Sequence, residues 1–429
     1  MNFKKTTLKN NLRIITAPMR ETQTVTVMAM IGVGSRYESE KEAGLSHFIE
    51  HMFFKGTKKR PTTLAISEEL ESIGGEFNAF TSKDKTMYYA KVDAKHIGTA
   101  LDVISDMYLN SKMEEKEIAK EKGTIIQEIN MYEDMPMRKV DDIFEGMLYA
   151  KNSLGREIAG SKKTVSSFKQ KDFVAYMKKF YVANDTVVAV AGNFDEKKVI
   201  LEIKKLFSKM ISGKKIKISK VKEKQKDSQT KIKFKKTDQT HLILGVRAYR
   251  RNHKDRYALA LMSIILGGGM SSRLFIEVRE KRGLAYYVRT RIEAYEDVGY
   301  VSTSAGVEHK NLEKTMGVIL AEYKKISKVK VSEKELQKAK DFIKGRSVMG
   351  MESSDEVAMF FADQELTDGE ILTLEEKFKL IDKVSIDDIL RVAQDVFQKS
   401  RLNLAVIGPH KNSEKLKKEL KLWKLNQKK

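Results

Sequence analysis

The chain has 429 residues, 41% of them hydrophobic, which is enough to bury a substantial core in two to four structural units. No apolar run approaches the ~20 residues that span a bilayer, and no signal-peptide stretch follows the N-terminus, so the sequence predicts a cytoplasmic protein that does not enter membranes. The absence of cysteine excludes disulfides, thiolate metal ligands and a cysteine nucleophile.

The formal net charge is +22, and a basic surface of this kind attracts polyanions. The lysines, however, are spread along predicted surface helices and a linker, without a zinc finger, a helix-turn-helix or an aromatic and basic platform. We therefore expect no nucleic-acid partner. The charge is interpreted as a solvated lysine-rich surface, and attraction of acidic peptide segments is the alternative.

The first strongly apolar segment, 24–32, is predicted to be a strand, and residues 41–55 are predicted to form a helix. The apolar positions of this helix recur at three- and four-residue spacing: Leu45, Phe48, Ile49 and Met52.

His47 and His51 lie one turn apart on this predicted helix and therefore share a face. Two imidazoles so placed can hold one cation, and Glu50 borders the same face, where it can act on a bound water. This arrangement is typical of zinc hydrolases. A solvated polar stripe on a helix is the alternative interpretation.

The chain also carries signs of an internal duplication. Periodicity is lost between 207 and 238, where lysine occupies nearly every other position, so 213–236 is predicted to be a linker between domains 1–212 and 237–429. Strand-like runs recur at nearly the same spacing in the two halves: 24–32 with 241–245, and 187–192 with 403–408. We predict an α+β fold of two duplicated domains, each a mostly antiparallel sheet covered by helices.

The second half lacks the histidine motif, because the corresponding segment, 257–265, is almost entirely apolar. Two histidines leave a zinc ion short of a third protein ligand, and without cysteine a third histidine or a carboxylate must supply it. The best candidates are Glu121 and Glu128, two turns apart on a helix predicted over 114–132. Either could bind the metal while the other orients a histidine, although glutamates at this spacing are also common as surface charge.

His-x-x-Glu-His is the inverse of the commoner His-Glu-x-x-His zinc helix and is typical of the inverzincins. With this motif and Glu128 farther along, the chain resembles the pitrilysin and insulysin family of zinc metallopeptidases, in its shorter, mitochondrial-processing-peptidase-like branch. The resemblance covers nearly the whole chain and includes residues 44–46, 74–81, 121–128, 134–136, 192–193, 267–275 and 279–286. One departure is the loop 152–155, where the family usually has a proline before the leucine.

This resemblance implies that one zinc ion per chain is held by His47, His51 and Glu128. Glu50 would then be the catalytic base and Glu121 a supporting acid. Manganese or cobalt is an alternative, since the same nitrogen and oxygen ligands accept them.

The resemblance also implies roles in peptide binding. Arg279 and Tyr286 would face the zinc site, with the tyrosine hydroxyl stabilising the oxyanion; a surface arginine and a packed tyrosine are the alternative. Asn78, Ala79 and Phe80 would belong to an exposed edge strand on which the substrate is added as a further strand, and a core role for Phe80 is the alternative.

We therefore predict a zinc endopeptidase or oligopeptidase. Larger family members carry four such domains, so two chains of this kind are expected to form a homodimer that encloses short or unfolded peptides. Arg279 and Tyr286 of one chain would then serve the metal site of the other. A heterodimer with a related subunit and a non-catalytic scaffold are the alternatives.

Overall fold

The computed structural model describes residues 2–214, 216–411 and 414–422, which divide into two compact units. Unit 1 contains the chain up to Asn130, Arg156–Ser219 and Ser347–Leu374. Unit 2 contains Met131–Gly155, Lys220–Arg346 and the chain from Glu375 onward. Each unit therefore draws on both halves of the sequence.

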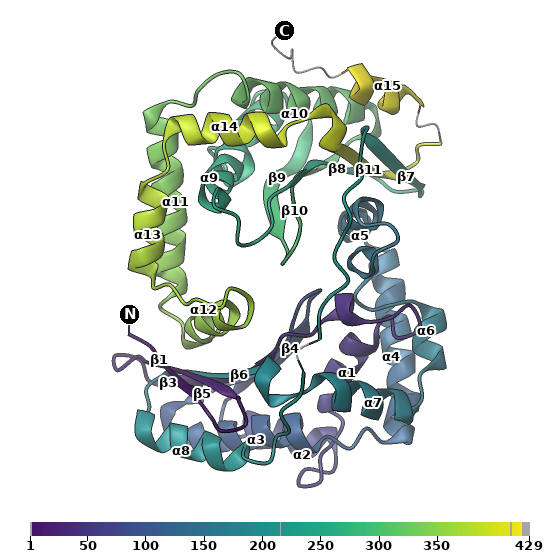
Figure 1. Cartoon of the computed structure of the whole chain (residues 1–429). Coiled ribbons are helices and arrows are strands. Elements are labelled where there is room, and N and C mark those ends of the chain that lie inside the picture. The colour runs from purple at the N-terminus through teal and green to yellow at the C-terminus, as the bar shows by residue number, and fades with distance from the viewer. Residues whose placement is uncertain (1, 215, 412–413, 423–429) are drawn as a thin grey trace. The chain divides into compact units, whose positions relative to one another are not determined.

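The sheet of unit 1 has the order β1-β2-β6-β3-β5-β4 (Figure 1). Its strands are β1 (Lys4–Thr7), β2 (Arg13–Pro18), β3 (Thr24–Ile31), β4 (Glu76–Thr81), β5 (Thr86–Asp93) and β6 (Thr186–Gly192). The strand pairs are antiparallel except for β2 and β6, which are parallel.

The helices of unit 1 cover both faces of this sheet. They are α1 (Leu45–Phe53), α2 (Thr63–Glu71), α3 (Ile97–Asn110), α4 (Glu115–Glu133, whose last turn belongs to unit 2), α6 (Lys162–Ser167), α7 (Gln170–Phe180), α8 (Glu196–Leu206) and α12 (Ser354–Thr367). The strand β3 is buried on both sides, because its alternate residues point to opposite faces. Val25 and Val27 pack with α1 and α3, whereas Met28 and Met30 pack with α12.

The sheet of unit 2 has the order β7-β11-β8-β10-β9. Its strands are β7 (Gln229–Phe234), β8 (Thr240–Ala248), β9 (Ala285–Ala294), β10 (Gly299–Val307) and β11 (Leu402–Gly408). β7 and β11 are parallel and the other pairs are antiparallel. This pattern repeats that of unit 1 strand for strand, without an equivalent of β1, which confirms the predicted duplication and fold class.

The helices of unit 2 are α5 (Pro136–Leu148), α9 (Arg256–Gly267), α10 (Leu312–Ile326), α11 (Glu333–Gly350, whose last turn belongs to unit 1), α13 (Leu374–Asp382), α14 (Ile386–Val396) and α15 (Glu414–Leu422). One turn of π-helix, η5 (Phe275–Glu280), follows α9. None of the helices in the described residues is long and apolar enough to cross a membrane.

Two equivalent helices are exchanged between the halves of the sequence. α5 comes from the first half but packs on β8 and β11 of unit 2, where Phe144 and Leu148 meet Ile243 and Ile407. α12 comes from the second half but packs on the sheet of unit 1 (Figure 1). There it covers β3 and β6, where Phe361 and its neighbours meet Met28 and Val187. The predicted domains 1–212 and 237–429 do not contain this exchange.

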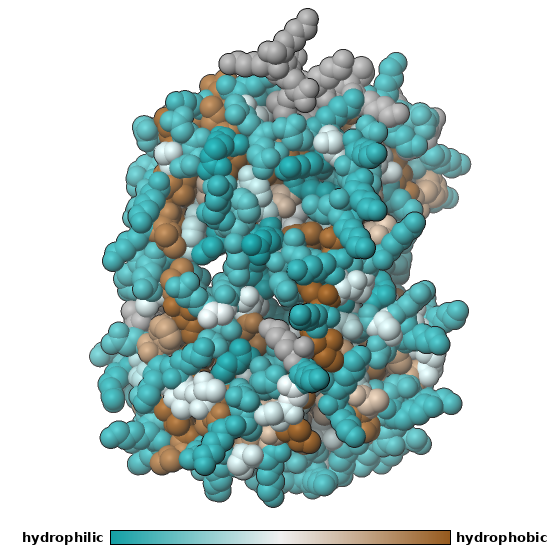
Figure 2. All heavy atoms as spheres, in the orientation of Figure 1, coloured by the Kyte–Doolittle hydropathy of each residue, from teal (hydrophilic) through white to brown (hydrophobic). Residues whose placement is uncertain are grey.

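Part of the predicted linker 213–236 is the strand β7. Its alternating lysines follow the two-residue repeat of a strand and are therefore no sign of lost periodicity, and Ile232 packs against the core of unit 2. On the face shown in Figure 2, hydrophilic residues cover most of the surface and hydrophobic residues form small scattered patches.

Candidate metal centre

The helix α1 is held at its start by a buried acid. The carboxylate of Glu38 accepts hydrogen bonds from the backbone N–H groups of Gly44 and Ser46, at 2.8 and 2.7 Å. Gly44 has a φ of 97°, and a Cβ atom there would lie 2.6 Å from the carbonyl oxygen of Ala159, so only glycine fits. The predicted helix 41–55 therefore begins later than expected, at Leu45.

The apolar face of α1 packs into the core of unit 1 and directs the histidines away from it. The imidazole rings of His47 and His51 are 4.6 Å apart between centroids. The Nε2 atoms of both rings lie 3.5 Å from the same oxygen, Oε2 of Glu128 on α4. Two helices thus bring two imidazoles and one carboxylate to a common point.

The geometry of this triad suits a divalent cation. Each of the three residues offers a ligand atom within 4.8 Å of the others. A separation of 3.5 Å is longer than an N–H···O hydrogen bond, but it is close to the ~3.4 Å expected between ligand atoms about 2.0–2.1 Å from a tetrahedral zinc. Nitrogen and oxygen donors of this kind accept zinc, and no second group of this sort lies among the described residues.

Glu121 supports one of the histidines from the side away from this point. Its Oε1 lies 2.9 Å from Nδ1 of His51, and its Oε2 lies 2.7 Å from Nζ of Lys55. Although burial alone would raise the pKa of Glu121, the hydrogen bonds from His51 and Lys55 lower it below its ordinary value. The carboxylate is therefore ionised and fixes the ring, with Nε2 left to face Glu128.

Glu50 lies beside His51 on α1 and is half-buried. Its carboxylate accepts a hydrogen bond from the hydroxyl of Thr81, the last residue of β4. Burial alone would lower the pKa of His51. The hydrogen bond with Glu121 and the negative charges of Glu128, Glu121 and Glu50 together raise it above its ordinary value. The end of β4 is thus tied directly to the histidine helix.

The outer side of β4 carries no further strand in the part of the chain that the structure describes. Asn78, Ala79 and Phe80 belong to this strand, as predicted, and pair with β5 on its inner side. Phe80 is half-buried and packs against the α12 side of the sheet, so it is neither fully exposed nor fully enclosed.

Arg279 and Tyr286 lie next to each other in unit 2. The guanidinium carbon of Arg279, in the π-helical turn η5, lies 5.4 Å from the ring centroid of Tyr286, at the start of β9. Tyr286 is 75% exposed, which leaves its hydroxyl accessible. Single π-helical turns are frequent at functional sites.

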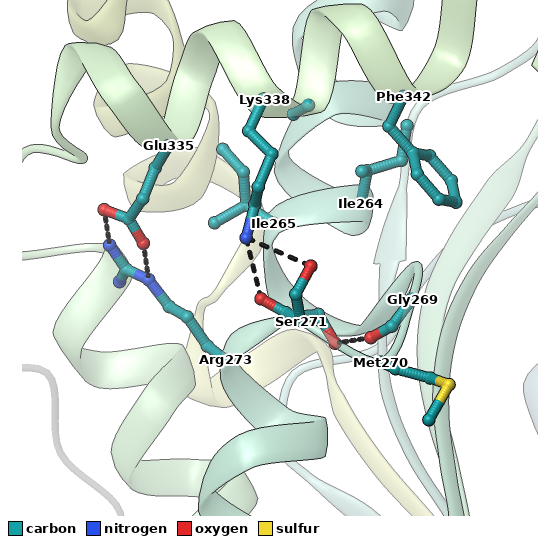
Figure 3. A pocket seen from close by; sticks show the side chains of 11 residues that line it. Ile264, Ile265, Gly269, Met270, Ser271, Arg273, Glu335, Lys338 and Phe342 are labelled. Carbon is teal, nitrogen blue, oxygen red and sulfur yellow. Dashed lines mark hydrogen bonds and ion pairs between the residues drawn. The ribbon is translucent and has the colours of Figure 1, made fainter. Parts of the chain in front are cut away.

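A separate cavity of about 200 Å³ in unit 2 lies between α9, the following loop and α11 (Figure 3). Its wall includes a bidentate ion pair between Arg273 and Glu335, in which Nε and Nη2 of the arginine lie 2.8 and 2.9 Å from the two carboxylate oxygens. Lys338 points to Ser271, whose backbone oxygen accepts its hydrogen bond (Figure 3). These interactions hold the loop that follows α9 to α11.

Two residues of the candidate centre were missed by the sequence reasoning. Lys55 stands four positions after His51, a spacing that places it beside the histidine even though α1 ends at Phe53. Thr81 ends the predicted edge strand for the substrate, but nothing in the sequence connects it with Glu50. The assignments of ligands, base and peptide-binding residues remain predictions.

Comparison with known proteins assigns both halves to one family. Residues 13–162 match the model described as insulinase (peptidase family M16), and residues 167–342 match the peptidase M16 inactive domain. An uncharacterized zinc protease of Rickettsia felis is 37% identical over 95% of this chain and 98% of its own length. The uncharacterized zinc protease YmxG of Bacillus subtilis is 34% identical over 96% of this chain and 99% of its own length.

Solved structures show the same fold. A protease from Helicobacter pylori superposes with a TM-score of 0.89 at 25% identity, covering 95% of this chain and 100% of that one. A chain of complex III2 from Candida albicans superposes with a TM-score of 0.84 over 97% of this chain and 99% of that one. At 19% identity, the second likeness concerns the fold alone.

Proposed function

This chain is a zinc protease of the insulinase (M16) peptidase family, and we propose that it hydrolyses short or unfolded peptides as an endopeptidase or oligopeptidase. The observation that carries the proposal is the convergence of His47, His51 and Glu128 beside Glu50. Two imidazoles and one carboxylate leave a fourth position for water, as in catalytic zinc sites.

We propose that His47, His51 and Glu128 hold one metal ion per chain, and that Glu121 and Lys55 keep His51 in the orientation required. When bound, zinc supplies Lewis acidity to a water molecule and to the scissile carbonyl group. Manganese and cobalt remain alternatives for the same ligands.

Glu50 is proposed to carry out the proton transfers. Its carboxylate removes a proton from the attacking water and returns it to the leaving amine, so one side chain acts first as base and then as acid. The hydrogen bond from Thr81 supports this role, because it fixes one oxygen of the Glu50 carboxylate and leaves the other oxygen to accept the proton. Thr81 also ends the strand beside which the peptide would lie.

Substrate binding is proposed to use the free side of β4. A peptide added there gains main-chain hydrogen bonds irrespective of its sequence, provided that it is extended. Arg279 and Tyr286 are proposed to bind the peptide as well, with the tyrosine hydroxyl donating to the oxyanion as charge develops on it. The exposure of Tyr286 supports a partner outside its own unit.

We further propose that two copies of the chain form a homodimer enclosing the substrate, in which Arg279 and Tyr286 of one copy serve the metal centre of the other. A chamber of this kind would select peptides by size and by lack of folded structure. The heterodimeric processing subunit is the second candidate, and the presence in this chain of both the metal residues and the arginine–tyrosine pair favours the homodimer.

Activity is tested with a quenched fluorescent peptide mixture and the purified protein, beside Glu50→Gln, a chelated sample and the control Glu40→Gln, an exposed charge on the preceding loop. Wild type and Glu40→Gln should cleave, whereas Glu50→Gln should retain zinc and lose activity. Zinc without cleavage would favour a missing partner subunit. Absence of bound metal would refute the proposed centre.

The homodimer is tested by complementation. Glu50→Gln and Tyr286→Phe are co-expressed with different tags, and the mixed dimer is isolated through both tags. If the tyrosine acts on the other copy, the mixed dimer has one intact centre and regains up to half of the wild-type rate. If it acts within its own chain, both centres are defective and no activity returns.

A further inference from the structure

The cavity of about 200 Å³ between α9, the following loop and α11 lies entirely within unit 2. Its lining has an apolar part, with Ile264, Met270 and Phe342, and a polar part around Lys338 (Figure 3). Met270 is 73% exposed and Phe342 is 40% exposed, although both side chains are large and apolar. An apolar group bound between them would remove this surface from water, which is favourable.

The polar part of the cavity carries one positive charge that no carboxylate balances. Glu335 is paired with Arg273 through both of its oxygens, so these two charges compensate each other. Lys338 donates instead to the backbone oxygen and the hydroxyl of Ser271, at 2.8 and 3.3 Å (Figure 3). It forms no ion pair within the described part of the chain, and an ammonium group has three N–H bonds to donate. A cation is therefore available beside an apolar cavity.

The volume of the cavity limits the size of the apolar group. An engineered apolar cavity of about 150 Å³ holds benzene, so a cavity of about 200 Å³ has room for roughly eight carbon atoms. A ligand that fits both parts of the lining is thus a short hydrocarbon with one negative charge at its end.

We propose that this cavity binds a medium-chain monocarboxylic acid. The hydrocarbon chain lies against Ile264, Met270 and Phe342, and the carboxylate accepts hydrogen bonds from Lys338. An amine of the same length would be repelled by the lysine, and an alcohol would lack the charge that the lysine attracts.

The cavity is continuous along the chain with the proposed peptide-binding arginine. Ser271 and Arg273, which line it, directly precede η5, and η5 carries Arg279. A carboxylate bound to Lys338 would compete with Ser271 for the same ammonium group, and would therefore change how this loop is held to α11. We expect the ligand to alter the KM for peptides, and this part of the inference rests on the proposed peptidase function.

Binding is tested by isothermal titration calorimetry of the zinc-loaded chain with octanoate, octanol and octylammonium. Octanoate should bind with a Kd of about 0.1 to 1 mM, the range expected for a ligand of about ten heavy atoms. Octanol and octylammonium should bind at least about tenfold more weakly, because each lacks the charged acceptor. Hexanoate should also bind about tenfold more weakly than octanoate, since two fewer methylene groups are buried.

Two variants address the two parts of the site. Lys338→Met should weaken octanoate binding about tenfold or more. Its matched control is Lys334→Met, an exposed lysine one turn earlier on α11 and outside the cavity, which should bind like wild type. Gly269→Leu should abolish binding by filling the apolar part: a Cβ atom at Gly269 would lie 3.4 and 3.6 Å from the ring of Phe342, which is ordinary contact. Circular dichroism confirms that each variant is folded.

A carboxylate can also bind zinc directly, so the metal centre needs its own control. His47→Ala removes a proposed zinc ligand in unit 1 and should bind octanoate with the affinity of wild type. Loss of octanoate binding in this variant would place the carboxylate on the metal and overturn the site in unit 2.

Two further results would overturn the site: equal affinity for octanoate and octylammonium, or octanoate binding that neither Lys338→Met nor Gly269→Leu weakens. The effect on activity is measured with the quenched peptides. Saturating octanoate should change KM about twofold or more in wild type and in Lys334→Met, and the same concentration should have little effect in Lys338→Met. Binding without any change in KM would contradict the link to Arg279. Failure of wild type to cleave any peptide would instead contradict the proposed function, and the calorimetry tests the site in that case as well.

Discussion

The helices α1 and α9 occupy equivalent places in the two units, each following the central strand of its sheet, yet they present different chemistry. α1 places His47, Glu50 and His51 opposite an apolar face. α9 is apolar nearly all around and buries most of its length, including Leu261 and Met262. The repeated strands and helices can therefore be kept while the metal site is lost, because packing and chemistry depend on different residues.

The largest effect that would test this contrast is removal of one histidine from each unit. His47→Ala should reduce bound zinc from about one ion per chain to near none and lower kcat/KM at least about 10³-fold, since the ligands act together. His241→Ala, on β8 of unit 2, should leave zinc content unchanged, because His241 bonds to the hydroxyl of Tyr287.

Zinc is measured by elemental analysis and folding by circular dichroism on the same preparations. Retention of a full equivalent of zinc by His47→Ala would refute the proposed ligand set. Loss of zinc from His241→Ala would show that the contrast between the units is false.

The next effect concerns the contribution of unit 2. Tyr286→Phe should lower kcat about 10²-fold with zinc content unchanged, as for loss of one hydrogen-bond donor to an oxyanion. Tyr287→Phe is the matched control: its side chain points to the opposite face of β9 and its hydroxyl bonds to His241. Equal rates for the two variants would remove the proposed role of Tyr286.

A smaller effect is expected from Lys55. Lys55→Met should weaken zinc binding about tenfold, since Glu121 would lose the charge that lowers its pKa and holds it against His51. Lys55→Arg should restore most of the affinity. The control is Lys58→Met, an exposed lysine on the following loop.

Affinity is measured by competition with a chelator of known zinc affinity, which requires no substrate. If Lys55→Met and Lys58→Met bind zinc equally well, the contact between Lys55 and Glu121 has no part in metal binding.

The smallest expected effect is on the folding stability of unit 2, which carries none of the proposed metal ligands. Hydrogen bonds from Arg273 lower the pKa of Glu335 to about 2, from an ordinary value of 4.5 (Figure 3). Because the pKa in the folded protein is lower, this pair stabilises the fold above about pH 4.5, and the stabilisation is lost as the pH falls toward 2. Glu335→Gln should therefore unfold at lower urea than wild type at pH 7, with a smaller difference at pH 3.

Urea midpoints of both proteins across this range provide the measurement, with and without chelator. A difference that grows on acidification would contradict the assignment, and a difference that depends on chelator would contradict the independence of this pair from the metal.

Much of the fold was predictable, because strands and helices differ in the period of their apolar residues. The segment 187–192 is apolar throughout and the segment 403–408 is apolar after Asn403, and both belong to strands, β6 and β11, that are buried on both faces. The exchange of α5 and α12 was not predictable. α5 has a clear apolar face, whereas the apolar residues of α12 are spread around the helix, and neither pattern shows which sheet covers the helix.

The candidate site was likewise predictable only in part. His47, Glu50 and His51 are related by the helical repeat, so their spacing alone places them together. Glu121 and Glu128 are also related by that repeat, but which of them faces the histidines depends on how α4 packs on unit 1, and the structure has Glu128 at both Nε2 atoms and Glu121 at Nδ1. Thr81 meets Glu50 through a tertiary contact for which a single sequence carries no signal. The spacing of Lys55 from His51 places it beside the histidine but does not show that it contacts Glu121.

The exchange of helices also affects how the chain folds as it is synthesised. The last strand of the unit 1 sheet ends at Gly192, whereas α12, which covers one face of that sheet, begins at Ser354. At about 5–20 residues per second, the ribosome takes on the order of ten seconds or more to supply it. During that interval Met28, Met30 and Val187 have no covering helix, so the nascent chain presents an apolar sheet face to chaperones and to other nascent chains.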